Sequence, residues 1–524
     1  MRQLTIKARK PLPLIQGRAA FAVNLVSQIS VIAAQMVISL FLTPIVLEKM
    51  GAEAYGFVGL VNNFVSYISV ITVALNSLAG RFITISHHGG DKEGAEVYYS
   101  SVFFANCAMA VVVLVVSLLL AANIQSLVAV SPGLVSDLRA MVLLAFLNCA
   151  LGLVVVVFGV AAFIKNQLYL NSIAQLISSV IRATLLCALF AIVAPHMWYY
   201  SVSAVVASVF FLVAQIWTAK RIAPEYRIRT DRFSLKSVGE ILKSGLWVSV
   251  ESINKLLLTG LDLWISNLFV GAYQMGIFSV SKTIPNALLS VSNSFASLFY
   301  PKCAELYAKG KGKELAEQFS FAMKFTAAIM IVPLAGLIVY GLYFYELWLP
   351  NRDNSEIMLV QILSVLTVIS LVSSALVEPL YYANTLANKI KGSVIITLGF
   401  SALALAIKLA LLALTDFDGL LIVASVSSIV MTVRHCVVQP IYAAQVLRLP
   451  KTCFFGSLVR EILGLTLVLA TFLALSNLLP LSSWLSFACS CLISSIVGYL
   501  ELLFVLLSKE DRQKAIGVLL RKRR

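Results

Sequence analysis

Long apolar stretches alternate with short polar segments along the whole chain. Each stretch is close to the roughly 20 residues that a helix needs to cross a hydrocarbon layer of about 30 Å. The pattern therefore predicts an all-α polytopic membrane protein with fourteen transmembrane helices. The predicted spans are residues 19–45, 54–80, 96–122, 138–163, 169–194, 198–219, 244–268, 274–300, 317–344, 357–383, 392–414, 419–444, 456–478 and 483–507.

Composition excludes a soluble domain. Hydrophobic residues make up 60% of the 524 residues and charged residues 12%, against roughly 45–50% and about 25% in soluble proteins. The longest polar segment, residues 220–243, is too short for a catalytic domain, and the chain contains no phosphate-binding loop or Cys/His metal-ligand spacing. We therefore expect a protein that moves its substrate, is not an enzyme, and has neither a cofactor nor a metal site.

The positive charge is explained by membrane orientation. Lys and Arg number 40 against 24 Asp and Glu, which leaves a net charge of +16. When loops are assigned alternately to the two sides, thirty of these basic residues fall on the side of the N-terminus. The positive-inside rule then places both termini in the cytoplasm. A bilayer, and not nucleic acid, is the partner that this distribution indicates.

Two short segments recur at nearly the same offset. The turn at residues 51–56 reappears at 271–276, and the segment 91–96 reappears at 312–317. Six predicted helices separate the copies, so the two halves have the same orientation in the membrane. We predict an N-terminal lobe of six helices (1–219), a basic cytoplasmic linker (220–243), a second six-helix lobe (244–446), and two further helices with a basic tail (447–524).

Ionisable residues inside the spans are the first candidates for a functional site, because a charge facing lipid costs several kcal/mol. Glu251, Lys255 and Asp262 are spaced by four and seven residues, which places them within about 40° of one another on one helix. Glu251 and Lys255 could instead form a simple ion pair. The lone cations Arg182, Lys282 and Lys408 could bind cargo, pair structurally, or extend toward the membrane surface. Arg434 and His435 lie near the cytoplasmic end of their span and are interpreted as topological.

Amides form a second set of candidates. Asn24, Gln28 and Gln35 repeat the same spacing on the first span, and further amides occur in spans 54–80 and 274–300 at Asn62, Asn63 and Asn286. Such side chains could line a polar path or hydrogen-bond neighbouring helices.

At this point the residues resemble a known family. The fourteen spans, the turn from Pro44 to Gly56 with its copy at 271–276, and the polar pattern ending in Asp262 are similar to the polysaccharide transporter branch of the multidrug/oligosaccharidyl-lipid/polysaccharide exporter superfamily. These are the Wzx-type flippases of the bacterial plasma (inner) membrane. The resemblance implies turnover of an undecaprenyl diphosphate-linked oligosaccharide from the cytoplasmic to the outer leaflet, for O-antigen or exopolysaccharide synthesis. It also implies alternating access around a cationic cavity, proton or sodium antiport, and a polymerase and a chain-length regulator as partners.

The cargo's chemistry then suggests a role for each candidate. A diphosphate needs fixed cations, whereas sugar hydroxyls need amides. For the diphosphate we expect Arg182, Lys255, Lys282 and Lys408, for the sugars Gln28, Gln35, Asn62, Asn63 and Asn286, and for the coupling ion Glu251 or Asp262.

Three alternatives remain. A multidrug antiporter of the same superfamily typically carries an acid in its first helix, where this chain has only amides. The lipid II flippase shares the fourteen helices and the cationic cavity, but its charged residues early in the first helix have only Arg18 as a counterpart. A lipid-linked polysaccharide polymerase should show a large outer loop, and the longest outer loops here, 123–137 and 345–356, are short.

Overall fold

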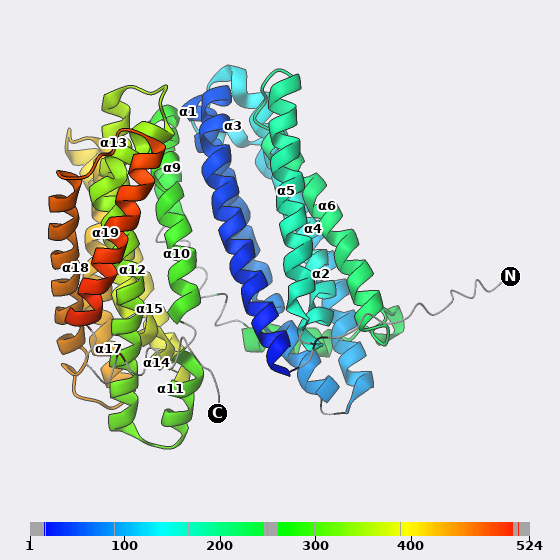
Figure 1. Cartoon of the computed structure of the whole chain (residues 1–524). Helices are drawn as coiled ribbons and strands as arrows, with labels where there is room; N and C mark the ends of the chain where they lie inside the picture. Colours follow the sequence, from blue (N-terminus) through cyan, green and yellow to red (C-terminus); the bar gives the residue numbers. More distant parts are fainter. Residues whose placement is uncertain are drawn as a thin grey trace. The chain divides into compact units, whose positions relative to one another are not determined.

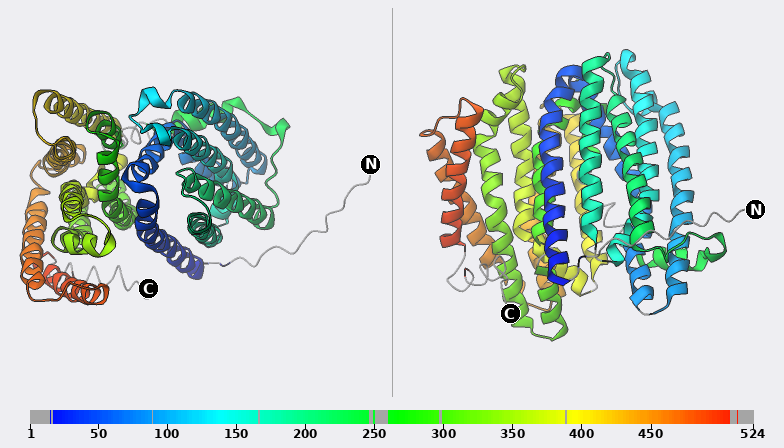
Figure 2. Two further views of the ribbon diagram at one scale, coloured as in Figure 1. Left: turned by 90° about the horizontal axis from the view of Figure 1, so that it is seen from above. Right: turned by 45° about the vertical axis from the view of Figure 1, so that its right-hand side comes forward.

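The computed structural model describes residues 15, 17–88, 90–165, 167–245, 249, 260–296, 299–387, 389–506 and 512. The chain divides into two compact units, Met1–Leu256 and Leu257–Arg524. Within each unit the long helices run side by side (Figures 1 and 2).

The first unit is built on five long helices. α4 packs closely on both α2 and α6, while α5 packs on α1 and α6. Its elements are α1 (Gly17–His88), α2 (Lys92–Ala122), α3 (Ile124–Leu127), η1 (Pro132–Leu134), α4 (Val135–Ile164), α5 (Leu168–Ile192), α6 (Tyr199–Ile222) and η2 (Thr230–Arg232).

The second unit is organised around its longest helix, α12, which packs against α13, α18 and α19. Its elements are α8 (Leu261–Phe269), α9 (Ala272–Ser281), α10 (Thr283–Ala296), α11 (Tyr300–Ala308), α12 (Gly312–Trp348), α13 (Asn354–Val377), η4 (Glu378–Leu380), α14 (Tyr381–Leu386), α15 (Ile390–Leu414), α16 (Gly419–Val433), the π-helical turn η5 (Arg434–Val438), α17 (Gln439–Val446), α18 (Phe455–Ser476) and α19 (Trp484–Val505).

Within the described residues, 11 segments are long and apolar enough to cross a membrane. Two predicted spans, 19–45 and 54–80, lie in α1 and count as one segment. Span 244–268 lies mostly outside the described residues, and span 274–300 falls on α9 and α10, which are separately too short. The total of fourteen helices therefore stays a prediction.

The sequence repeat has a common backbone geometry. Gly51 breaks α1 with φ 83° and ψ 169°, and Gly271 separates α8 from α9 with φ 134° and ψ 162°. Side chains with a Cβ rarely adopt these conformations, so glycine is required at both positions. The two copies of the turn thus change the chain direction in the same way.

The second repeated segment also has matching hydrogen bonds. Gly90 and Gly310 both have positive φ. The Asp91 N–H donates to Ser86 O at 3.0 Å, and the Lys311 N–H donates to Leu306 O at 3.1 Å. The loops that precede α2 and α12 therefore share this hydrogen-bonded turn, one residue out of register with the match between 91–96 and 312–317.

Proline residues within the helices are compensated by hydroxyl groups. Pro285 has no N–H to donate to Ser281 O, and the Ser364 hydroxyl of α13 donates to that carbonyl at 2.7 Å. Pro333 likewise has no N–H to donate to Ile329 O. That carbonyl instead accepts a hydrogen bond from the Tyr499 hydroxyl of α19 at 3.2 Å. Neighbouring helices thus satisfy backbone groups that lipid could not.

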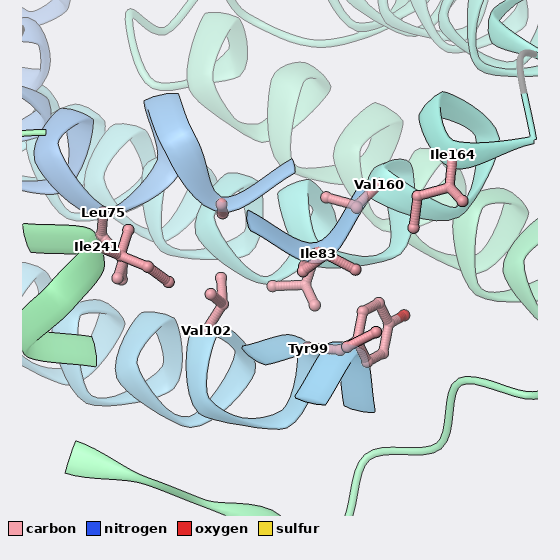
Figure 3. Close-up of a cluster of buried hydrophobic side chains, with 10 residues drawn as sticks. Leu75, Ile83, Tyr99, Val102, Val160, Ile164 and Ile241 are labelled. Atoms are coloured by element: carbon pink, nitrogen blue, oxygen red, sulfur yellow. The ribbon is translucent and has the colours of Figure 1, made fainter. Parts of the chain in front are cut away.

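The polar segment 220–243 packs on the first unit. Ile241 joins a buried apolar cluster with residues of α1, α2 and α4 (Figure 3). The Tyr98 hydroxyl donates to Glu240 at 2.8 Å, and Arg232 pairs with Glu93 at 3.2 Å. Burial and the charge of Glu225 raise the pKa of Tyr226 to about 12, so this phenol stays neutral at physiological pH. The segment that the sequence marks as a basic linker is therefore an ordered part of this unit.

Candidate functional site

An ionic cluster lies inside the second unit. Asp262 accepts from Lys408 Nζ at 2.5 Å through Oδ1 and from Lys282 Nζ at 3.2 Å through Oδ2. The Ser427 hydroxyl lies 3.2 and 3.3 Å from the same two oxygens. We call Asp262, Lys282, Lys408 and Ser427 the Asp262 cluster. It brings together three of the residues that the sequence analysis selected.

Local structure explains how these side chains meet. Asp262 stands in the first turn of α8, where a negative charge is favoured by the helix dipole. Lys282 occupies the break between α9 and α10, which Pro285 produces by leaving a carbonyl unserved within the helix. Lys408 and Ser427 come from the neighbouring helices α15 and α16. Four separate helical elements therefore build one site.

The cluster is buried, and both of its lysines pair with the same carboxylate. Asp262 is 4% exposed and Lys408 is 3% exposed, while the Lys282 side chain retains 11% exposure. The two ammonium groups share the Asp262 carboxylate in a setting where water screens charges little. Lys282 also lies 4.2 Å from the centre of the Phe278 ring, a cation–π contact.

Arg182 occupies a different environment in the first unit. Its guanidinium lies 4.5 Å from the centre of the Tyr200 ring on α6, and its Nε is buried without a hydrogen-bond partner. Arg182 is fourteen residues from the start of α5, and Lys408 is eighteen residues from the start of α15. Counted from the start of its own helix, Lys408 therefore lies about one helical turn further along than Arg182.

Most of the amides selected from sequence are accessible. Gln28, Gln35, Asn62 and Asn286 are exposed, and Asn63 is half-buried. Asn24 is buried, and its side chain accepts from the Tyr169 backbone N–H at 2.9 Å, which ties α1 to α5. Asn24 therefore has a packing role, whereas the exposed amides have surface available for a ligand.

Glu251 and Lys255 lie outside the described residues. Their assigned roles, in coupling and in diphosphate binding, stay predictions.

Ser427 was not among the residues selected from the sequence. Arg434 and His435 were interpreted there as charges that set the membrane topology. Both of the latter are buried: Arg434 donates to Thr397 and to the Tyr381 hydroxyl, and the His435 ring lies 3.1 Å from Ser373. The feature of the sequence that could have indicated an irregular helix here is Pro440. A proline at this position has no N–H for the Cys436 carbonyl, four residues earlier, and so favours the π-helical turn η5 that contains Arg434 and His435.

Comparison with known proteins places the chain in a family. Residues 20–306, more than half of the chain, match the family model described as polysaccharide biosynthesis protein. The chain belongs to this family. A relative described as the uncharacterized membrane protein EpsK of Bacillus subtilis (strain 168) is 27% identical over 495 residues, which cover 94% of this chain and 97% of the relative.

Solved structures of similar fold are transporters. The lipid II flippase MurJ in an inward closed conformation matches with a TM-score of 0.63 and 12% identity, covering 95% of this chain and 100% of its own. An inward-facing multidrug resistance transporter of the MATE family and MOP superfamily matches with a TM-score of 0.59 and 14% identity, covering 79% of this chain and 95% of its own. The prediction of an all-α, multi-pass membrane protein is therefore confirmed, as is the resemblance to this superfamily.

Proposed function

We propose that this member of the polysaccharide biosynthesis family flips a polyprenyl diphosphate-linked oligosaccharide across the bacterial plasma membrane. The observation that supports this most directly is the Asp262 cluster, which has two buried lysines for one carboxylate. Phosphate oxygens are the anions that such fixed ammonium groups bind well in an apolar setting. The transporter fold and the family match supply the context.

The cluster suggests how cargo is bound. In the described state the lysines are held by Asp262, and a diphosphate would compete with that carboxylate for them. Lys282, which keeps more exposure than Lys408, is the lysine that a ligand would meet first. Arg182, in the first unit, stays a further candidate for phosphate, because its buried Nε has no hydrogen-bond partner. The exposed amides Gln28, Gln35, Asn62 and Asn286, with Asn63, would serve the sugar hydroxyls.

The same geometry links cargo to a coupling cation. A proton or sodium ion on Asp262 would release the lysines, so cation and diphosphate would favour each other's binding. Antiport requires that the cation and the diphosphate disfavour each other's binding at some step. Glu251, the other acid selected from the sequence, would bind the cation at that step.

A flipping assay tests the proposal. Protein reconstituted in vesicles with a fluorescent polyprenyl diphosphate oligosaccharide should make the label accessible in the opposite leaflet. Lys282→Gln/Lys408→Gln should slow this about 100-fold, since each lost charge-assisted bond is worth at least about 1.4 kcal/mol. Lys282→Arg/Lys408→Arg should retain more activity, and Lys309→Gln, on an exposed loop, should behave as wild type.

Normal flipping by a folded Lys282→Gln/Lys408→Gln variant would contradict the lysine assignment. Export of cationic dyes by the wild type without any flipping would instead favour the multidrug antiporter alternative.

A further inference from the structure

Glu461 is a buried acid outside the Asp262 cluster. It stands in α18 and is 0% exposed. Neither Oε1 nor Oε2 has a hydrogen-bond partner. Buried carboxylates without donors are rare, because their charge is then stabilised by neither water nor protein.

The acid lies on the apolar face of its helix. Leu458, Gly464, Val468 and Phe472 are buried on α18 together with Glu461, at the spacing of a single helical stripe. α18 packs closely against α12 and α19 (Figure 1). The carboxyl group therefore points into packed protein, whereas its neighbour Arg460 is exposed.

The charged group that acts on Glu461 from the facing helix is Lys324 of α12, which is 9% exposed. α19 contributes Glu501, which accepts from Thr471, ten residues or about 15 Å along α18.

Two arrangements can relieve the cost of this buried acid. A proton can neutralise it, or the side chain can remain ionised opposite Lys324. The first matches the described geometry, in which the carboxyl oxygens make no hydrogen bond. The second is within reach because Lys324 faces the same interior. Because neither arrangement is strongly stabilised, the Glu461 side chain is suited to reversible protonation.

We propose that Glu461 is a proton-binding site inside the membrane, distinct from the Asp262 cluster. It exchanges between a neutral acid packed between α18 and α12 and a carboxylate balanced by Lys324. The site needs no cargo, so it stands or falls independently of the flippase proposal.

Infrared difference spectroscopy tests this directly on the full-length protein in lipid. On a change from mildly acidic to mildly alkaline pH, the wild type should lose a carbonyl stretch of a protonated carboxylic acid. That band should be missing from Glu461→Gln, which has the shape of the neutral acid. Glu501→Gln is the matched control on the adjacent helix and should keep the band.

Lys324 supplies a second measurement that does not depend on Glu461→Gln. Lys324→Met removes the balancing charge, so the wild-type band should persist to higher pH, whereas Lys324→Arg should titrate near the wild type. Identical spectra in wild type and Glu461→Gln would overturn the proposal. A band of Glu461 that never titrates, or that is unmoved in Lys324→Met, would overturn it as well.

Discussion

Asp262 bridges two lysines, because its two carboxylate oxygens pair separately with Lys408 and with Lys282. The consequences of losing each charge are therefore unequal. Without Asp262, the two buried ammonium groups lose the carboxylate that bridges them. Without Lys408, Lys282 still balances Asp262.

We therefore expect Asp262→Asn to destabilise the protein by about 3 kcal/mol or more, as removal of one partner from a buried ion pair does. Lys408→Met should cost clearly less, and Asp262→Asn/Lys408→Met should recover part of the loss. Thermal unfolding of the protein in detergent measures all three. An equal loss in Asp262→Asn and Lys408→Met would contradict the description of Asp262 as the bridge between the two lysines.

At the scale of elements, the break between α9 and α10 positions Lys282. Pro285 creates the break, and Ser364 serves the carbonyl of Ser281 that the proline leaves free. The hydroxyl of Ser364 also contacts the Tyr345 hydroxyl at 2.7 Å. One side chain on α13 thus holds the interrupted helix and its neighbour together.

Ser364→Ala should destabilise the protein by about 1–3 kcal/mol, because a buried carbonyl loses its donor. Pro285→Ala should restore part of that stability in the double variant, since the new N–H at position 285 can bond Ser281 O. Chemical denaturation of the two single variants and the double variant provides the measurement. Strictly additive effects would show that the two residues do not share this carbonyl.

At the scale of the whole molecule, the basic loops predict orientation. Residues 92 and 312 begin the long helices α2 and α12 at one end of each unit. At the other end, residue 133 lies in the turn η1 and residue 353 directly precedes α13. Single cysteines at these four sites, in a chain whose eight native cysteines are replaced, provide probes.

Lys92→Cys and Gly312→Cys should react with an impermeant maleimide only in inside-out vesicles, and Gly133→Cys and Asp353→Cys only in right-side-out vesicles. Mass spectrometry measures the labelling. Reaction of Lys92→Cys and Gly133→Cys from the same side would contradict the predicted topology.

The sequence by itself determined the properties that depend on local pattern. Apolar runs of membrane-spanning length predict helices wherever they occur, and the glycines at 51 and 271 mark turns because only glycine adopts their conformation freely. Charge in the segments between spans predicts orientation through a simple count. These features need no knowledge of which helices are neighbours.

Only the tertiary structure decided which polar groups meet. Asp262 and Lys408 are separated by 146 residues, and Asp262 and Ser427 by 165, so no spacing rule could pair them. Sequence selected Asp262, Lys282 and Lys408 singly, because a charge in an apolar span is conspicuous, but assigned the acid and the lysines to different ligands. Glu461 was not selected from the sequence, because it does not stand out there. An acid near the start of a span looks like a hydrated helix end, and only the packing of α12 and α19 around it excludes water from the carboxyl group. Electrostatic energy depends on distance in space and on access to water, and both are set by how the helices pack.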